Sequence, residues 1–195
     1  RDYYASRGLG DVYKRQDFTK ALFEEIGSAV IKTADFKIFK TDNEHWLNDY
    51  ARFCAYRDYF HTSNFREWPL KKEGERAVDA PELDAEITYY KFVQFLLHRQ
   101  LQAVHNEAQN LGVILKGDIP IGICPNSVAA WVDSHLFHFD GQAGAPPDDF
   151  AVQGQNWGFP TYNWEAMALD GYAWWRRRFC LLYTSDAADD MQCVD

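Results

Sequence analysis

Residues 112–123, GVILKGDIPIGI, decide the fold class that the sequence predicts. The apolar residues 113–115 follow directly after a helical pattern, and Gly117 and Pro120 end the apolar run. A short apolar run bounded by glycine and proline is typical of a parallel strand that is buried on both faces, and a helix just before it completes an αβ unit. The sequence therefore predicts an α/β fold, with Asp118 at the carboxyl end of a buried strand.

Asp118 has two interpretations at this position. The carboxyl end of a strand in a fold built from αβ units is where binding and catalytic groups are mounted, so the carboxylate can be a ligand-binding group. Aspartate is also common in turns and as a helix cap, where it contacts only the backbone. The local sequence leaves both interpretations open.

Three stretches of the sequence have helical periodicity. Apolar and aromatic residues recur at three- and four-residue steps over 43–60 and over 87–110, which is the spacing of an amphipathic helix. In the second stretch the predicted buried face runs from Tyr89 to Val104, and the helix ends at the glycine that opens the quoted segment. A third helix is predicted over 162–179, with Asn163 as its cap.

The charge of the sequence disfavours two classes of partner. The formal net charge is −9 and the pI is about 5.1, whereas nucleic acids and anionic membrane surfaces bind clustered lysine and arginine. No apolar run approaches the roughly 18 residues that suggest a membrane span, and the N-terminus lacks the layout of a signal peptide. We therefore expect no nucleic acid and no membrane among the partners.

The cysteines and histidines indicate neither a disulfide framework nor a metal site. The cysteines lack CxxC spacing, and the local pairs His98 with His105 and His135 with His138 have no Cys, Asp or Glu at a recurrent metal-ligand spacing. We expect reduced thiols in a cytoplasmic protein, histidines on the surface or in packing, and no metal or organic cofactor. The cysteines are Cys54, Cys124, Cys180 and Cys193.

Three stretches are expected to lie outside the packed core. Residues 1–16, RDYYASRGLGDVYKRQ, and 180–195, CLLYTSDAADDMQCVD, have no periodicity continuous with their neighbours and resemble translated sequencing-adaptor sequence. The natural domain is therefore expected to span 17–179, and naturally disordered termini are the alternative. Residues 71–86 are charged and contain a second proline after Pro69, which predicts a solvated connection.

A long loop with many aromatic residues is predicted over 144–165, GAPPDDFAVQGQNWGFPTYNWE. Its glycines and prolines suit neither helix nor strand, and a loop of this length is usually functional. Aromatic faces pack against the flat C–H faces of pyranose rings, while sugar hydroxyls pair with Asp, Asn and Gln side chains. The loop offers both kinds of group: Asp148, Asp149, Gln155 and Asn156 beside Phe150 and Trp157.

The tryptophans near this loop are predicted to differ in role. Five of the seven tryptophans lie between Trp131 and Trp175. Trp157, between Asn and Gly, is predicted to face a ligand, whereas Trp164, Trp174 and Trp175 recur at helical spacing and are predicted to lie in the core. The alternative is that the aromatic residues of the loop only cover the rim of the fold.

Several short motifs follow one another in a characteristic order along the chain. They are DNEHWLNDYARF (42–53), HTSNFREWP (61–69), KGDIPIGI (116–123), Trp131, Leu136 with Phe137, GAPPDDF (144–150), GQNWGFPTYNWE (154–165) and DGYAWWRRRF (170–179). In this order they resemble the 4-α-glucanotransferases of the amylomaltase or disproportionating-enzyme family, over nearly all of 17–179. The form of the loop is most similar to the branch that includes plant-type cytosolic disproportionating enzymes and their bacterial relatives.

The resemblance implies a partial (β/α)8 barrel with irregular helical insertions, internal to a glucanotransferase catalytic domain. It implies transfer of α-1,4-glucan segments between maltooligosaccharides, or glycogen and starch chains, by a retaining double displacement without a cofactor. It also implies that Asp118 and Trp157 lie beside the donor sugar at the cleavage point, with Gln155 among the sugar contacts. The further candidate glucan-binding residues of the loop are Asn156, Asp148 and Phe150.

The resemblance leaves the reacting groups of the enzyme outside this sequence. It places the nucleophile in an Arg-x-Asp-His-Phe motif beyond Trp157, at the end of the next strand, and no such motif is present. No catalytic residue is therefore assigned, and the chain alone is expected to be inactive. Two alternatives stay open: a non-catalytic α-glucan-binding protein, and a hydrolase that uses Asp118 with Asp148 or Glu165, which needs carboxyl groups about 5 Å apart.

Overall fold

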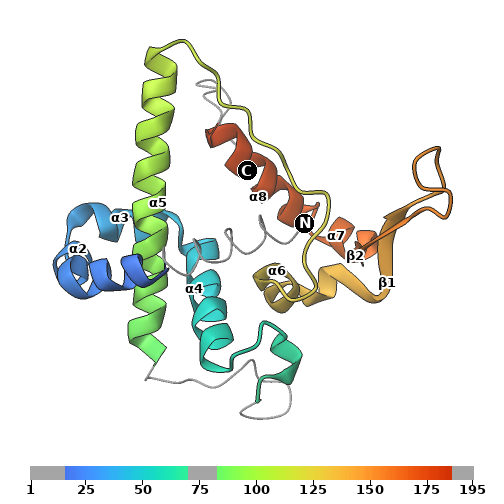
Figure 1. Ribbon diagram of the computed structural model, residues 1–195, viewed down its shortest axis with the longest axis horizontal. Helices are drawn as coiled ribbons and strands as arrows, with labels where there is room; N and C mark the ends of the chain where they lie inside the picture. The colour runs from blue at the N-terminus through green and yellow to red at the C-terminus, as the bar shows by residue number, and fades with distance from the viewer. Residues whose placement is uncertain (1–15, 70–82, 186–195) are drawn as a thin grey trace. The chain divides into compact units, whose positions relative to one another are not determined.

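The computed structural model describes residues 16–69 and 83–185, and the contacts divide these residues into two units. The first unit holds the described residues up to Thr62 and from Arg66 to Leu101, and the second holds Ser63–Phe65 and the residues from Gln102 onward. Each unit has its own buried core. Figure 1 shows the helices and strands of the described chain.

The first unit is helical. Residues 16–22 form a helix that continues through a π-helical turn and a short α-helix, and three longer helices follow. The elements are η1 (Phe23–Gly27), α2 (Ser28–Val30), α3 (Ala34–Asp42), α4 (Glu44–Tyr59), the 3-10 turn η2 (Phe65–Glu67) and α5 (Asp84–Asn110). The first residue of η2 and the part of α5 after Leu101 belong to the second unit. The helices predicted over 43–60 and 87–110 are confirmed as α4 and α5.

Apolar side chains of α3, α4 and α5 fill the core of the first unit. Phe92 and Leu47 are completely buried. The ring of Phe95 lies 5.4 Å from that of Phe36 and 5.5 Å from that of Phe39, measured between ring centroids. Burying rings of this size contributes more to the stability of packed helices than helix propensity does.

Helix α5 is buried only over its first half. Its buried residues lie between Tyr89 and Phe95, whereas Leu97, Leu101 and Val104 are exposed. The predicted buried face is therefore correct at its start and wrong at Val104. The helix has 27 residues, which makes it about 40 Å long, and the 16-residue α4 that packs against it is too short to cover that length.

The second unit combines short helices with a β-hairpin. The strands β1 (Phe137–Ala145) and β2 (Gln155–Tyr162) form a two-stranded antiparallel sheet. The helical elements are α6 (Val128–Val132), the 3-10 turn η4 (Ser134–Leu136), α7 (Trp164–Leu169) and α8 (Ala173–Ser185). Figure 1 shows the hairpin projecting from α6 and α7, with its loop at the far end. The buried cluster at its base contains Ile123, Ala130, Leu136, Phe137, Met167 and Trp174.

The buried parallel strand predicted over 113–115 is not formed. These residues lie in an irregular segment, where Val113 is 53% and Ile114 is 83% exposed. A parallel strand needs neighbouring strands to satisfy its backbone groups, and the strands of the described chain, β1 and β2, pair with each other. In place of the predicted parallel α/β pattern, the described residues form helices and one antiparallel hairpin.

The long loop predicted over 144–165 is mostly regular structure. Residues 144 and 145 end β1, residues 155–162 form β2, and only 146–154 connect the two strands. The sequence FHFD at 137–140 alternates apolar and polar residues, which is the period of a strand. These residues form the start of β1.

The single helix predicted over 162–179 is two helices. Asn163 caps α7 as predicted, because its Oδ1 accepts a hydrogen bond from the Ala166 N–H at 3.1 Å. After α7 ends, Asp170 opens α8 in the same way, since its Oδ1 accepts from the Ala173 N–H at 3.1 Å. A short polar residue that offers its side chain to a backbone N–H starts a new helix rather than continuing an old one.

The stretches predicted to lie outside the core are only partly within the described residues. Residues 1–15, 70–82 and 186–195 are outside them. Within them, residues 84–86 begin α5 instead of ending the predicted connection, and α8 continues to Ser185, across the predicted boundary after Phe179. That domain boundary stays a prediction.

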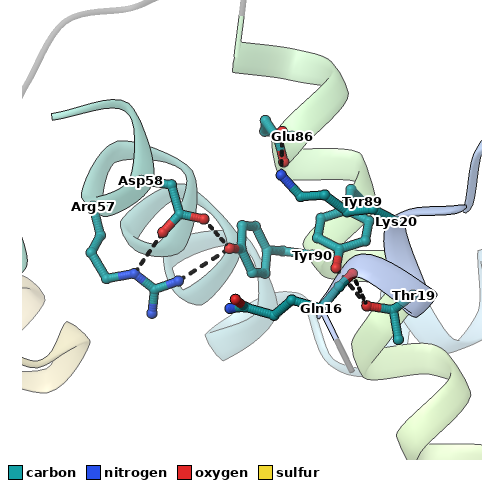
Figure 2. A network of polar contacts seen from close by, with 8 residues as sticks. All are labelled: Gln16, Thr19, Lys20, Arg57, Asp58, Glu86, Tyr89 and Tyr90. Carbon is teal, nitrogen blue, oxygen red and sulfur yellow. Dashed lines mark hydrogen bonds and ion pairs between the residues drawn. The ribbon is translucent and has the colours of Figure 1, made fainter. Parts of the chain in front are cut away.

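A polar network joins α4 and α5 in the first unit (Figure 2). The Arg57 guanidinium donates to Asp58 at 2.8 Å and to the Tyr90 hydroxyl at 3.1 Å, and that hydroxyl donates to Asp58. Burial and the hydrogen bond to Asp58 raise the pKa of Tyr90. Earlier on α4, burial and the neighbouring Cys54 raise the pKa of Tyr50 to about 12. Both phenols are therefore held in the protonated form by the fold.

We expect stability to fall as the pH rises from 10 to 12, and Tyr50→Phe to remove part of that fall. The unfolded phenol ionises near its ordinary pKa of 10.0 and the folded one at about 12, so its stabilising effect is present below pH 10 and lost as the pH passes the folded pKa. Urea unfolding at neutral and alkaline pH measures the difference. Tyr59→Phe, at an exposed tyrosine of the same helix, is the control, and equal pH slopes for all three chains would contradict the prediction.

Candidate functional site

A β-bulge in β2 presents Trp157. Asn156 and Phe159 pair with consecutive residues of β1, so Trp157 and Gly158 are extra residues on β2. Gly158 has a φ of 70°, a left-handed conformation that glycine adopts without steric cost. Bulges bend a strand and re-aim its side chains, often beside active sites. Here the Trp157 side chain is 39% exposed.

Gln155 and Asn156 place amide groups beside this ring. The Trp157 Nε1–H donates to Gln155 Oε1 at 3.1 Å. Asn156 Nδ2 donates to Gln142 Oε1 on β1 at 2.7 Å, and Asn156 Oδ1 accepts from the Gly158 N–H at 2.8 Å. Gln155, Asn156 and Trp157 are all exposed. The structure thus brings three predicted site residues together, as an aromatic face bordered by amides with remaining hydrogen-bonding capacity.

The connection between β1 and β2 lies at the far end of the hairpin (Figure 1). Asp148 and Phe150 belong to this connection. Asp148 Oδ1 accepts hydrogen bonds from the backbone N–H groups of Phe150 at 2.9 Å and Ala151 at 2.6 Å. An aspartate that bonds the backbone two and three residues ahead stabilises a tight turn. The Phe150 side chain is 98% exposed. Asp148 therefore has a structural contact in the loop, and the Phe150 ring is open to a ligand.

Asp118 lies on the irregular segment between α5 and α6, and its side chain is exposed. Because the residues around it form neither strand nor helix, it is neither at a strand end nor a helix cap. The residues after it are anchored to other elements: Arg178 Nη2 on α8 donates to Pro120 O at 3.3 Å, and the Tyr162 hydroxyl on β2 donates to Ile121 O at 3.1 Å. Its role in ligand binding stays a prediction.

Aromatic rings pack around Tyr162 at the base of the hairpin. Its centroid lies 5.0 Å from that of Trp164, 5.2 Å from that of Trp175 and 5.9 Å from that of Trp174. Burial raises the pKa of the Tyr162 hydroxyl, and the nearby Arg178 opposes that shift. Trp174 is buried as predicted and Trp175 is half-buried. The core prediction is wrong for Trp164, which stacks on Trp175 and is 52% exposed.

Three side chains of this region escaped the sequence predictions. Gln142 holds Asn156, and the apolar–polar alternation at the start of β1 is the signal that could have placed it on a strand beside the tryptophan loop. Tyr162 and Arg178 contact the segment after Asp118 across 41 and 58 residues of chain. A local sequence pattern cannot predict contacts between residues that are so far apart in the chain.

The arrangement suits a neutral ligand rich in hydroxyl groups. An exposed indole face packs against C–H groups, while the neighbouring amides of Gln155 and Asn156 pair with hydroxyls. Among the residues that the structure describes, no three His, Cys, Asp or Glu side chains form a group that could hold a metal ion. Within the same residues, no helix is both long and apolar enough to cross a membrane.

Comparison with protein families settles the family of the chain. The family model described as 4-alpha-glucanotransferase, glycoside hydrolase family 77, matches residues 11–185. The chain belongs to the 4-alpha-glucanotransferase family. The match takes in all the predicted site residues, from Asp118 to Trp157.

Curated relatives of this 4-alpha-glucanotransferase family member are much longer than the chain. The 4-alpha-glucanotransferase DPE2 of Oryza sativa subsp. japonica is 40% identical over 183 residues, which are 91% of this chain and 19% of the rice protein. The 4-alpha-glucanotransferase of Streptococcus pneumoniae serotype 4 is 34% identical over 90% of this chain and 35% of that protein. The chain thus spans about a fifth to a third of the length of these relatives.

Solved structures of the family show the same fold over part of their length. An amylomaltase from Streptococcus agalactiae in complex with acarbose is similar with a TM-score of 0.79 and 26% identity, over 89% of this chain and 37% of that one. An amylomaltase from Corynebacterium glutamicum gives a TM-score of 0.70 and 27% identity, over 90% of this chain and 24% of that one. The helices and hairpin described above are therefore shared with part of these amylomaltases.

We expect Asp148→Ala to loosen the hairpin loop of this glucanotransferase-family chain. The substitution leaves two backbone N–H groups without their acceptor, which speeds amide exchange at Phe150 and Ala151 by about three- to tenfold, the effect of one lost hydrogen bond. Hydrogen exchange followed by mass spectrometry measures it. Asp149→Ala, at the exposed neighbour, is the matched control, and equal exchange rates in both variants would show that Asp148 does not hold the loop.

Proposed function

We propose that this chain is part of the (β/α)8 catalytic barrel of a protein that transfers α-1,4-glucan segments between glucan chains, and that it supplies glucan-binding residues. The single observation that carries the proposal is the exposed Trp157, bordered by Gln155 and Asn156, in a chain that the 4-alpha-glucanotransferase model matches almost throughout. The relatives that share its sequence carry the name of that activity, and a structural neighbour is in complex with acarbose. α-1,4-Glucans and maltooligosaccharides are therefore its proposed ligands.

The proposed contacts follow from the chemistry of the side chains. The indole face of Trp157 packs against the C–H face of a glucose unit. The amides of Gln155 and Asn156 both donate and accept hydrogen bonds, and the exposed carboxylate of Asp118 accepts bonds from sugar hydroxyls. Phe150 and Asp148, at the far end of the hairpin, are proposed to contact another part of the same glucan chain.

The proposed reaction gives a role to the exposed aromatic side chains of the candidate site. In the first step of a retaining double displacement, a carboxylate bonds to the anomeric carbon while the glycosidic C–O bond breaks and the leaving chain takes a proton from an acid group. In the second step, an acceptor hydroxyl gives its proton to that group and displaces the carboxylate. Water competes with the acceptor in that second step, so side chains that bind a glucan and exclude water favour transfer over hydrolysis. Because the motif of the nucleophile is not in this sequence, the residues of this chain are proposed to bind and orient the glucan.

The thiols suit the proposed cytoplasmic location. Cys54 and Cys124 are free in the described part of the chain. Unpaired cysteines are typical of reducing compartments, where disulfides are rare. The free thiols support this part of the proposal.

We expect the chain to bind maltotetraose with a change in tryptophan fluorescence, and Trp157→Ala to weaken that binding by about tenfold or more, as removal of a stacking aromatic does. The measurement is a fluorescence titration, with circular dichroism to check folding. Trp164→Ala is the matched control, because Trp164 is also exposed but lies at the base of the hairpin. Equal affinities of wild type and Trp157→Ala, or a larger loss in the control, would contradict the proposed site.

We expect no disproportionation of maltotriose by the 195-residue chain, because it lacks the family's nucleophile motif. A glucose-release assay tests this, and a whole 4-alpha-glucanotransferase in the same buffer is the positive control. Release of glucose by the chain, abolished by Asp118→Asn, would favour the hydrolase interpretation instead.

A further inference from the structure

Residues 120–123, which begin two positions after Asp118, are each held by a different contact. Pro120 O and Ile121 O accept the hydrogen bonds from Arg178 and Tyr162. A Cβ added at Gly122 would meet the Phe159 ring at 2.4 Å, so the backbone itself lies against that ring. Ile123 is buried in the core cluster of the second unit. The residues from 112 to 118, in contrast, are exposed with the exception of the half-buried Leu115.

The Tyr162 hydroxyl is held in place by the packing of its ring. The tyrosine is the last residue of β2, where it pairs with Phe137. Its ring contacts those of Phe137, Trp164, Trp174 and Trp175. A ring packed by several neighbours has little freedom to rotate, so its hydroxyl offers a hydrogen bond at a fixed point. That point is the carbonyl of Ile121.

The Arg178 guanidinium is oriented by two other rings. Its central carbon lies 4.5 Å from the Trp174 centroid and 5.6 Å from the Trp175 centroid. A planar guanidinium stacks on an aromatic face while its N–H groups still donate in its own plane. Lysine carries the same charge without this planar fork, so it cannot reproduce both contacts.

We propose that Tyr162 and Arg178 are positioning residues for Asp118. Asp118 is two residues before Pro120, so its Cα lies within about 7 Å of the anchored backbone. The two hydrogen bonds hold the carbonyls of Pro120 and Ile121, and they thereby restrict where the Asp118 carboxylate can lie. The role of Asp118 itself rests on the proposed function, whereas the two anchoring contacts do not.

Limited proteolysis of the full chain tests the anchoring without any sugar. Trypsin cleaves after Lys116, which is exposed just before Asp118, and native-state cleavage follows the population of open conformations. We expect Tyr162→Phe and Arg178→Lys each to speed this cleavage by about three- to tenfold, the effect of one lost hydrogen bond. Tyr172→Phe and Arg177→Lys, at exposed positions of the same unit, are matched controls that should cleave at the wild-type rate.

A double-mutant cycle tests whether the anchors act through Asp118. Tyr162→Phe and Asp118→Asn are made singly and together, and maltotetraose binding is measured for all four chains. We expect Tyr162→Phe to weaken binding by about three- to tenfold in the wild type and to have little further effect once Asp118 is changed. A merely structural role would give the same loss in both backgrounds.

The outcomes separate the positioning role from the proposed function. Faster cleavage together with a non-additive cycle supports the positioning role. Unchanged cleavage in both anchor variants overturns it, and so does faster cleavage with fully additive binding losses. If the wild-type chain binds no maltotetraose, the proposed function fails for this chain, and the cleavage rates alone decide whether Tyr162 and Arg178 hold the segment.

Discussion

The candidate site depends on the packing at the base of the β-hairpin. A two-stranded hairpin is at best marginally stable by itself in water, so β1 and β2 need a partner. They find it where Phe137 and Tyr162, which face each other across the strands, pack against Trp174 of α8. Met167 of α7 is completely buried in the same cluster. Every candidate sugar contact on β2 is placed by this packing, although none of the residues that form it was predicted to bind sugar.

Two helices of the first unit, α4 and α5, could be predicted because their signals are local. The apolar spacing of α4 and α5 is complete within each helix, and their buried faces meet through Leu47 and Phe92. The sequence predictions are wrong where the burial of a residue depends on segments far away in the sequence. Val104 continues the helical pattern of α5 and is exposed, and residues 113–115 have the composition of a buried strand without strands to pair with among the described residues. An apolar pattern shows that a segment can be buried. Whether the segment is buried depends on the rest of the fold.

The sequence could predict the part of the candidate site whose residues are neighbours in the chain. Gln155, Asn156 and Trp157 are neighbours in sequence, and the structure keeps them together through the Trp157 and Asn156 hydrogen bonds. The bulge that presents the ring was not predictable, because it arises from the register between two strands. The same holds for Asp118, whose segment is held by residues of β2 and α8 far along the chain.

The hydrogen bond from Trp157 to Gln155 bears on how a sugar can bind. An exposed indole that also offers a free N–H would be solvated at its edge, and a ligand that covered it would have to remove that water. Here the N–H is already paired within the strand, so in the proposed complex a glucose unit would displace water from the apolar face alone. The bulge holds the backbone and the hydrogen bond to Gln155 restricts the ring, which lowers the side-chain entropy that is lost on binding. In the proposed function, the aromatic and amide groups therefore form one preorganised surface for a neutral glucan chain.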